Sequence, residues 1–96
     1  MEVLCTIKLK TKHVYTKNGR YRLYIDNFLL AERIFPKLEK KGYRIEESIV
    51  LNLKPGIHIL SIENLYDVAQ VVFDDVTIGD QIFYDLNSTD LSFRIN

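Results

Sequence analysis

The sequence predicts an all-β domain over residues 1–96, an antiparallel β-sandwich or jelly roll of about eight short strands. Apolar residues recur at every second position along most of the chain, which is the period of a half-buried strand. Turn residues interrupt this alternation about every 8–14 residues. No expected strand precedes a helical segment long enough to carry the chain to a parallel neighbour. Together these observations favour a sandwich or a small barrel.

Three strands are expected in the first third of the chain. Residues 1–10 alternate as a half-buried strand. The turn signal at 16–19 follows, because Asn and Gly accept a positive φ easily. Residues 21–25 and 28–35 then form a hairpin around a second turn at 26–27. The side chains expected to face the core are those of Val3, Cys5, Ile7, Leu9, Tyr21, Leu23 and Ile25.

The middle of the chain is expected to hold a loop and two strands. Residues 36–42 are polar and too short for an independent helix, so we expect a loop there. Residues 43–53 alternate as a long strand, with Glu47 the exception on its apolar face. Lys-Pro-Gly-Ile at 54–57 predicts a type II turn, because proline presets the first central φ and glycine supplies the positive second one. Residues 57–63 are expected as the returning strand.

The last third of the chain is expected to hold three more strands. Residues 69–78 form the first, with a bulge around Asp74 and Asp75, where acids interrupt the alternation. Turns at 79–80 and 87–90 then delimit strands at 81–84 and 91–95.

Length and composition indicate one folded domain with one core. The chain has 96 residues, 47% of them hydrophobic and 27% charged, which is ordinary for a globular protein. Residues 1–10 lack the unbroken apolar centre of an export signal, and no run reaches the roughly 18 apolar residues of a membrane helix. The single Cys5 excludes an intramolecular disulfide. We therefore expect a cytoplasmic protein, or part of a particle assembled in the cytosol, without a membrane partner.

The formal net charge of zero conceals an uneven distribution. Residues 1–44 carry eleven Lys and Arg against four acids, a balance of +7, and residues 45–96 carry two against nine, a balance of −7. One interpretation is that interleaved strands neutralise these charges within the fold. The other is a homo-oligomer, in which the basic half of one copy meets the acidic half of the next, or an anionic external partner.

Residues suited to catalysis are few and scattered. Cys5 falls on the core face of the first strand, where a buried structural thiol is expected. His13 lies in a basic stretch, and His58 follows the Pro-Gly turn on a strand, where packing or hydrogen bonding is expected. The four glycines stand singly, so there is no phosphate-binding loop. We expect a protein that is not an enzyme and needs no cofactor.

Three acids late in the chain raise the question of calcium binding. Asp74, Asp75 and Asp80 are close in sequence, and calcium takes six to eight oxygen ligands. Neighbouring strand residues point to opposite faces unless a bulge brings them together. The alternative, which we favour, is a set of solvent-facing acids beside a turn.

Aromatic and basic residues interleave over residues 12–24. If Tyr21 faces the core, then Arg20, Arg22 and Tyr24 share the opposite face. Such a face suits a sugar, which stacks its C–H surface on an aromatic ring, or single-stranded nucleic acid. It also suits an ordinary solvated sheet face. The candidate ligand-binding residues are Tyr15, Arg20, Arg22 and Tyr24.

Three segments resemble the jelly rolls of carbohydrate-binding modules. They are Gly-Arg-Tyr-Arg-Leu-Tyr-Ile-Asp-Asn at 19–27, Leu-Lys-Pro-Gly-Ile-His-Ile-Leu-Ser-Ile at 53–62 and Val-Val-Phe-Asp-Asp-Val-Thr-Ile at 71–78. The chain departs from that family's pattern at Phe28, where glycine is usual, and it has no tryptophan. The resemblance implies a sandwich fold and a non-enzymatic binding role.

Three hypotheses for function follow from the sequence. The first is a binding module that recognises a glycan or a protein surface. The second is a structural subunit of a larger assembly such as a phage virion, because edge strands can pair with a neighbour. The third is a small barrel that binds single-stranded nucleic acid, against which the zero net charge weighs.

Overall fold

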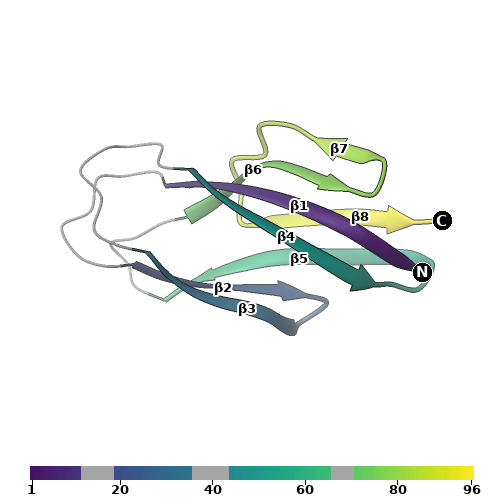
Figure 1. Cartoon of the computed structure of the whole chain (residues 1–96), viewed down its shortest axis with the longest axis horizontal. Coiled ribbons are helices and arrows are strands. Elements are labelled where there is room, and N and C mark those ends of the chain that lie inside the picture. The colour runs from purple at the N-terminus through teal and green to yellow at the C-terminus, as the bar shows by residue number, and fades with distance from the viewer. Residues whose placement is uncertain (12–18, 36–43, 66–70) are drawn as a thin grey trace.

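A computed structural model of the chain describes residues 1–11, 19–35, 44–65 and 71–96, and all elements within these ranges are β-strands. Eight strands form two antiparallel sheets of four strands each, which lie one over the other (Figure 1). The first sheet has the order β4-β1-β6-β7, and the second has the order β3-β2-β5-β8. The prediction of an all-β sandwich of about eight strands is confirmed.

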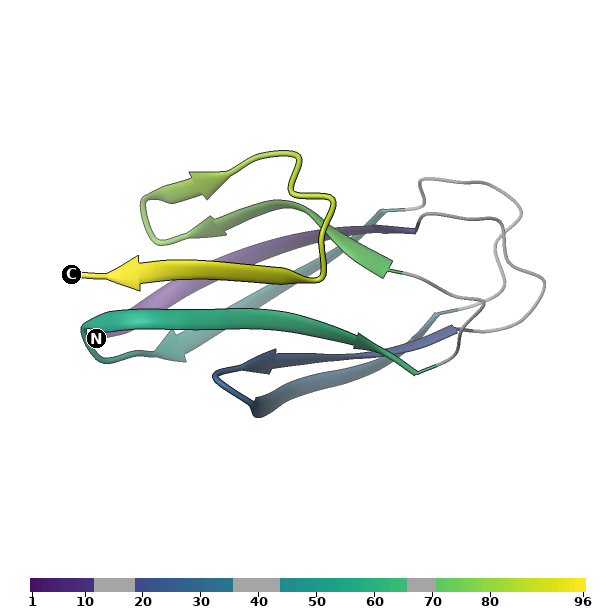
Figure 2. The same ribbon diagram turned by 180° about the vertical axis from the view of Figure 1, so that it is seen from behind.

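The strand bounds agree with the expected ranges to within a few residues. In the first sheet the strands are β1 (Glu2–Thr11), β4 (Arg44–Asn52), β6 (Val71–Ile78) and β7 (Gln81–Phe83). In the second sheet they are β2 (Gly19–Ile25), β3 (Phe28–Phe35), β5 (Gly56–Asn64) and β8 (Asp90–Ile95). Two sequential hairpins, β2–β3 and β6–β7, each stay within one sheet. Figure 2 shows the second sheet from its outer side, with β5 between β8 and β2.

The core lies between the sheets and contains the side chains that the alternation selects. Each predicted core residue of the first two strands is buried. The largest fully buried side chains include those of Tyr21 and Phe73. The buried apolar residues of the last strand are Leu91, Phe93 and Ile95.

The β2–β3 turn is formed by the two residues expected there. Asp26 and Asn27 have φ angles of 48° and 70°, the left-handed region that Asp and Asn tolerate better than other non-glycine residues. Phe28 is paired with Ile25 directly after the turn. The predicted hairpin is therefore confirmed.

The connection between β4 and β5 differs from a return within one sheet. β4 pairs with β1, whereas β5 pairs with β2 and β8 in the other sheet. The Leu53 amide still donates to the Met1 carbonyl (2.9 Å), which extends the β1–β4 ladder to that point. Pro55 has no N–H with which to continue it, and Gly56 has the predicted positive φ, 130°. This connection therefore carries the chain from one sheet to the other.

The bulge predicted in β6 is present. Ile7 pairs with Val76 and Leu9 with Phe73, so Asp74 and Asp75 together stand opposite the single residue between Ile7 and Leu9. The predicted turn residues 16–18 and the loop at 36–42 lie outside the described residues. Within the described residues, the structure holds no helix with the length and apolar character to cross a lipid bilayer.

Candidate functional site

The aromatic and basic face predicted on β2 exists. Tyr21 is buried, and Arg20, Arg22 and Tyr24 alternate with the buried side chains on the outer face of the second sheet. Tyr15 lies outside the described residues, so its position relative to this face is a prediction only.

A carboxylate from β5 joins two of the predicted residues. Glu63 lies opposite Arg22 in the sheet, and its Oε1 is 3.3 Å from Arg22 Nη1. Tyr24 Oη donates to the same oxygen (3.2 Å). On the other side, Arg22 Nε donates to Glu32 Oε1 of β3 (2.8 Å), which raises the pKa of the guanidinium above its already high value. Arg22 is therefore a permanent cation held between two carboxylates.

A polar hollow lies beside this network. It has a volume of about 370 Å³ and is lined by residues of β2, of the turn after it and of β5. The strands β2 and β5 run side by side in the second sheet (Figure 2). Its lining combines one aromatic ring with an amide, a hydroxyl and a carboxylate. The residues that line this hollow, the Tyr24 hollow from here on, are Tyr24, Asn27, Ser61, Ile62 and Glu63.

Arg20 lies on the same face but does not belong to the hollow. It pairs with Ile34 of β3, two positions before Arg22. Its Nε is buried and has no hydrogen-bond partner among the residues that the structure describes. Arg22 and Tyr24 were thus predicted from the sequence, whereas Asn27, Ser61 and Glu63 were not. Ser61 and Glu63 alternate with buried residues of β5, but only the β2–β5 register shows that they adjoin Tyr24.

The acidic cluster contains Asp74, Asp75 and Asp85, rather than the predicted Asp80. Carboxylate oxygens of these three residues lie within 4.8 Å of one another. The bulge brings Asp74 and Asp75 together, and the segment after β7 returns Asp85 to them. Asp80 follows Gly79 in the β6–β7 turn, at the other end of these strands. The expected grouping was wrong because it ignored this reversal of the chain.

Two cations pair with Asp74, the buried member of the cluster. Asp74 is 3% exposed, which contradicts the expectation that these acids face solvent. Arg44 Nη1 donates to Asp74 Oδ2 (2.6 Å), and Lys10 Nζ lies 3.8 Å from Oδ1. The Asp85 amide donates to Asp75 Oδ1 (2.9 Å). These contacts describe an ion-pair network that fixes the bulge.

Ion pairs also connect the basic half of the sequence, residues 1–44, with the acidic half, residues 45–96. Several ion pairs between described residues join a cation of residues 1–44 to an acid of residues 45–96. These pairs are Lys10–Asp74, Arg44–Asp74, Arg22–Glu63 and Arg33–Glu47. Neutralisation within the fold, the first interpretation of the charge pattern, is thus supported by this part of the chain.

Glu47, the acid on the apolar face of β4, connects the two sheets. Arg33 of β3 donates to it through Nε (2.9 Å to Oε1) and Nη2 (3.3 Å to Oε2). Tyr21 of β2 also donates to Oε1 (3.2 Å). Burial, followed by the charge of Glu47, raises the pKa of Tyr21, so the phenol remains protonated as a donor.

Cys5 and His58, the two described residues considered for catalysis, have surroundings typical of structural residues. Cys5 is buried, and burial raises the pKa of its thiol, which keeps it protonated and unreactive. His58 Nδ1 lies 2.5 Å from Asp26 Oδ2, and Nε2 lies 2.7 Å from the Lys54 carbonyl oxygen. Its ring is also 5.8 Å from that of Phe93. The prediction that His58 packs and hydrogen-bonds is confirmed, and His13 lies outside the described residues.

The His58 pair predicts a pH-dependent stability. The hydrogen bond with Asp26, and then that with Lys54, raises the pKa of His58 above its ordinary 6.5. The stabilisation that protonated His58 provides is therefore complete below about pH 6.5. It is lost as the pH rises through the pKa of His58 in the folded protein. Burial raises the pKa of Asp26, but hydrogen bonds from His58 and the Ile59 amide lower it overall, so its own contribution is lost only in acid.

We expect the free energy of unfolding in urea to fall by roughly 0.5–1 kcal/mol between pH 6 and pH 9. This is the stabilisation that a solvent-screened ion pair ordinarily provides. His58→Gln should remove this slope, and His13→Gln, the control, should keep it. An equal slope in the His58→Gln protein would contradict the assignment.

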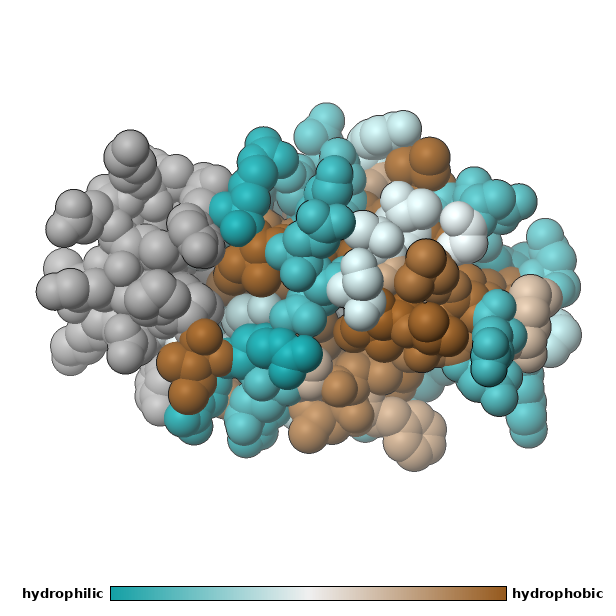
Figure 3. All heavy atoms as spheres, in the orientation of Figure 1, coloured by the Kyte–Doolittle hydropathy of each residue, from teal (hydrophilic) through white to brown (hydrophobic). Residues whose placement is uncertain are grey.

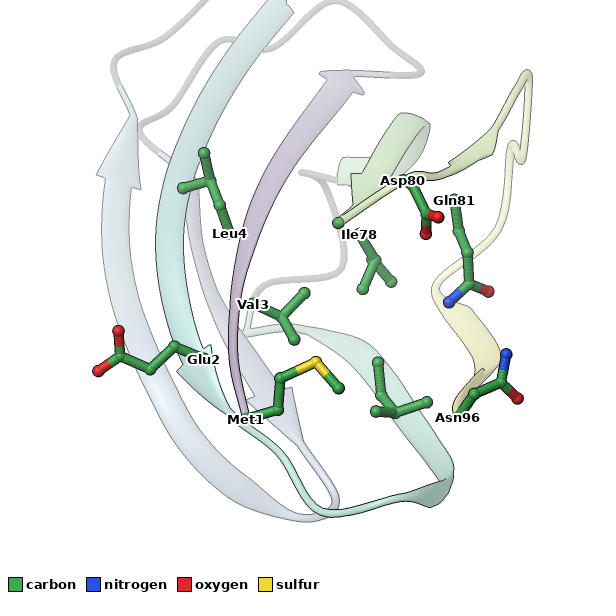
Figure 4. Close-up of a pocket in the computed structure, with 10 residues that line it drawn as sticks. Met1, Glu2, Val3, Leu4, Ile78, Asp80, Gln81 and Asn96 are labelled. Atoms are coloured by element: carbon green, nitrogen blue, oxygen red, sulfur yellow. The ribbon is translucent and has the colours of Figure 1, made fainter.

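A second pocket lies where the two chain ends meet (Figure 4). It has a volume of about 350 Å³, and both apolar and polar residues line it. The apolar ones are Met1, Val3, Leu4, Ile78 and Ile95, and the polar ones are Glu2, Asp80, Gln81 and Asn96. This pocket contains Asp80 but none of the predicted ligand-binding residues.

Comparison of the chain with protein-family models, with curated proteins and with solved structures found no match.

Proposed function

We propose that this protein is a non-enzymatic binding module that takes a carbohydrate in the Tyr24 hollow. The observation that carries the proposal is the lining: an aromatic side chain and three different hydrogen-bonding groups open into one shallow volume. A sugar ring offers matching surfaces, because its C–H groups pack on an aromatic ring while its hydroxyls both donate and accept.

Glu63 is the polar centre of the proposed site. Arg22 and Tyr24 both bond to its Oε1. No described residue bonds to its Oε2, which can accept from the hydroxyl groups of a ligand. A carboxylate oxygen is a stronger acceptor than a neutral oxygen. Ser61 and Asn27 supply a hydroxyl and an amide to the same lining.

The hollow supports binding better than hydrolysis. Glycoside hydrolysis ordinarily requires two carboxyl groups on either side of the scissile bond. The five lining residues include one carboxylate, Glu63. Glu32 is held on the far side of Arg22, where it bonds to Nε. The same engagement of Arg22 by two acids disfavours the nucleic-acid hypothesis, because a phosphate would have to displace a carboxylate.

A structural subunit, for example of a virion, is the second candidate function. The observation that favours it is the exposure of large apolar side chains on both sheets, which is typical of surfaces that contact other proteins. Those more than half exposed include Leu4, Val50, Leu29, Ile34 and Ile57.

Calorimetric titration against a panel of oligosaccharides tests the first proposal. We expect Tyr24→Ala to weaken binding of a recognised sugar about tenfold, the value of one aromatic contact of roughly 1.4 kcal/mol. Glu63→Gln should weaken it as well, because the charged acceptor is lost. Tyr84→Ala is the matched control, since Tyr84 is 67% exposed and follows β7 in the other sheet. Binding that survives Tyr24→Ala and Arg22→Ala together would overturn the proposal.

A further inference from the structure

The four edge strands of the sandwich differ in how they are protected. A free edge exposes unpaired N–H and C=O groups, and proteins block it with short strands, bulges, prolines, lysines or covering side chains. β7 has three residues, and β3 carries a register shift opposite Leu23 and Tyr24. On β8, Gln81 Nε2 donates to the Arg94 carbonyl (2.8 Å). Among the described residues, β4 has the least protected edge. Nine residues pair with β1 without a break, and the strand lacks proline and lysine. Its inward-pointing charge, Glu47, is held by Arg33 and Tyr21.

The β1–β4 ladder shows which backbone groups of β4 are exposed. The bond from the Leu53 amide to the Met1 carbonyl makes odd-numbered residues the hydrogen-bonded partners of β1. The Gly79 amide donates to the Leu4 carbonyl on the opposite side of β1, which confirms the alternation. The N–H and C=O groups of even-numbered residues therefore point away from β1, at the open edge. These residues of β4 are Arg44, Glu46, Ser48, Val50 and Asn52.

We propose that β4 pairs with β4 of a second copy, antiparallel, about a two-fold axis at Ser48. Ser48 is the midpoint of Arg44–Asn52, so this register uses the whole strand. Five even-numbered pairs at two bonds each would give about ten backbone hydrogen bonds. The two four-stranded sheets would thereby become one continuous sheet across the dimer.

The side chains of β4 are complementary to themselves in this register. Arg44 would lie opposite Asn52, and Glu46 opposite Val50, so no like charges face each other. A displacement that centres the axis on Glu46 would instead place two carboxylates opposite one another. The register centred on Ser48 avoids this repulsion and pairs the whole length of the strand.

The outer face beside this edge is apolar and exposed. Val50 is 61% exposed and pairs with Leu4 of β1, which is 57% exposed. Figure 3 shows apolar side chains gathered on the face that β1 and β4 form. In the paired sheet, the aliphatic part of Glu46 from one copy would cover the open side of Val50 from the other. Pairing through β4 thus shields apolar surface in addition to the edge.

Light scattering over a range of protein and salt concentrations tests this proposal. We expect a mass of twice 11.3 kDa that persists in high salt, because the contact is a backbone ladder. Association through the oppositely charged halves would dissociate in high salt instead. Ser48→Lys places like charges at the axis and should raise the dimer dissociation constant more than tenfold. Ser92→Lys is the matched control on β8, the strand whose edge Gln81 contacts, and it should leave the dissociation constant unchanged.

Amide hydrogen exchange provides a second readout that does not depend on a variant. In the associated protein we expect slow exchange at Ser48 and Val50, whose amides face the open edge, and rapid exchange after dilution to monomer. A chain that stays monomeric at every concentration, a dimer unaffected by Ser48→Lys, or a dimer with fast exchange at Ser48 would each overturn the proposal.

Discussion

Replacing Phe73 with alanine is expected to destabilise the domain by about 4 kcal/mol, because a buried phenyl ring is lost and a cavity remains. Phe73 is fully buried in β6. Its backbone also bonds to the segment that leads into β8, through Ser88 (2.8 Å) and Asn87 (2.8 Å). The free energy of unfolding of a typical domain is about 5–15 kcal/mol in total, so the variant should be close to unfolding.

Urea unfolding followed by circular dichroism measures this effect. Phe28→Ala is the matched control, because Phe28 is 74% exposed and should change the unfolding free energy by less than about 0.5 kcal/mol. Equal losses in the two variants would mean that the core is not between the sheets as described.

Replacing Arg44 with methionine is expected to cost about 2 kcal/mol, although Arg44 itself lies largely in solvent. The reason is its partner: Asp74 is buried, and Arg44 Nη1 is its nearest cation at 2.6 Å. Without the guanidinium, a buried carboxylate remains with Lys10 at 3.8 Å. Arg94→Met, a change at an exposed arginine of β8, is the control and should have little effect.

The same unfolding measurement distinguishes a structural from a superficial ion pair. Asp74→Asn in the Arg44→Met background should recover part of the lost stability, because the uncompensated charge is then removed. A loss in Arg44→Met that matches the loss in Arg94→Met would show that the pair with Asp74 contributes nothing to folding.

The sequence predicted the strands and faces of this fold because both depend on local patterns. Alternation identified the buried residues of β1, and Asp26 with Asn27 identified the hairpin turn. The partners of β4 and β5 were not predictable in this way, since Pro55 and Gly56 end a ladder equally well before a return or a change of sheet. Pairing between strands is a long-range property that one strand's composition does not record.

The residues of the candidate site were likewise predictable only where they depend on a local pattern. Arg22 and Tyr24 were predictable, because residues of one strand at a spacing of two share a face. Glu63 and Asp85 were not, because each reaches its site from a strand or loop distant in sequence. The burial of Asp74 also depends on cations that β1 and β4 supply. In each case the missing information was the register between strands.

The proposed binding site and the proposed dimer contact occupy different sheets. The Tyr24 hollow lies on the outer face of the second sheet, whereas β4 is an edge of the first. A dimer formed through β4 would therefore leave both hollows open, and two weak sites on one assembly bind a multivalent glycan more tightly than one. Each proposal nevertheless has its own test.

Chemical-shift mapping of the isotope-labelled protein during titration with an oligosaccharide panel tests the carbohydrate site most directly. We predict that a recognised sugar shifts the amide signals of Tyr24, Asn27, Ser61 and Glu63 together in a saturable way. Signals that stay unchanged with every sugar, or shifts confined to the pocket between Met1, Ile78 and Ile95, would contradict it.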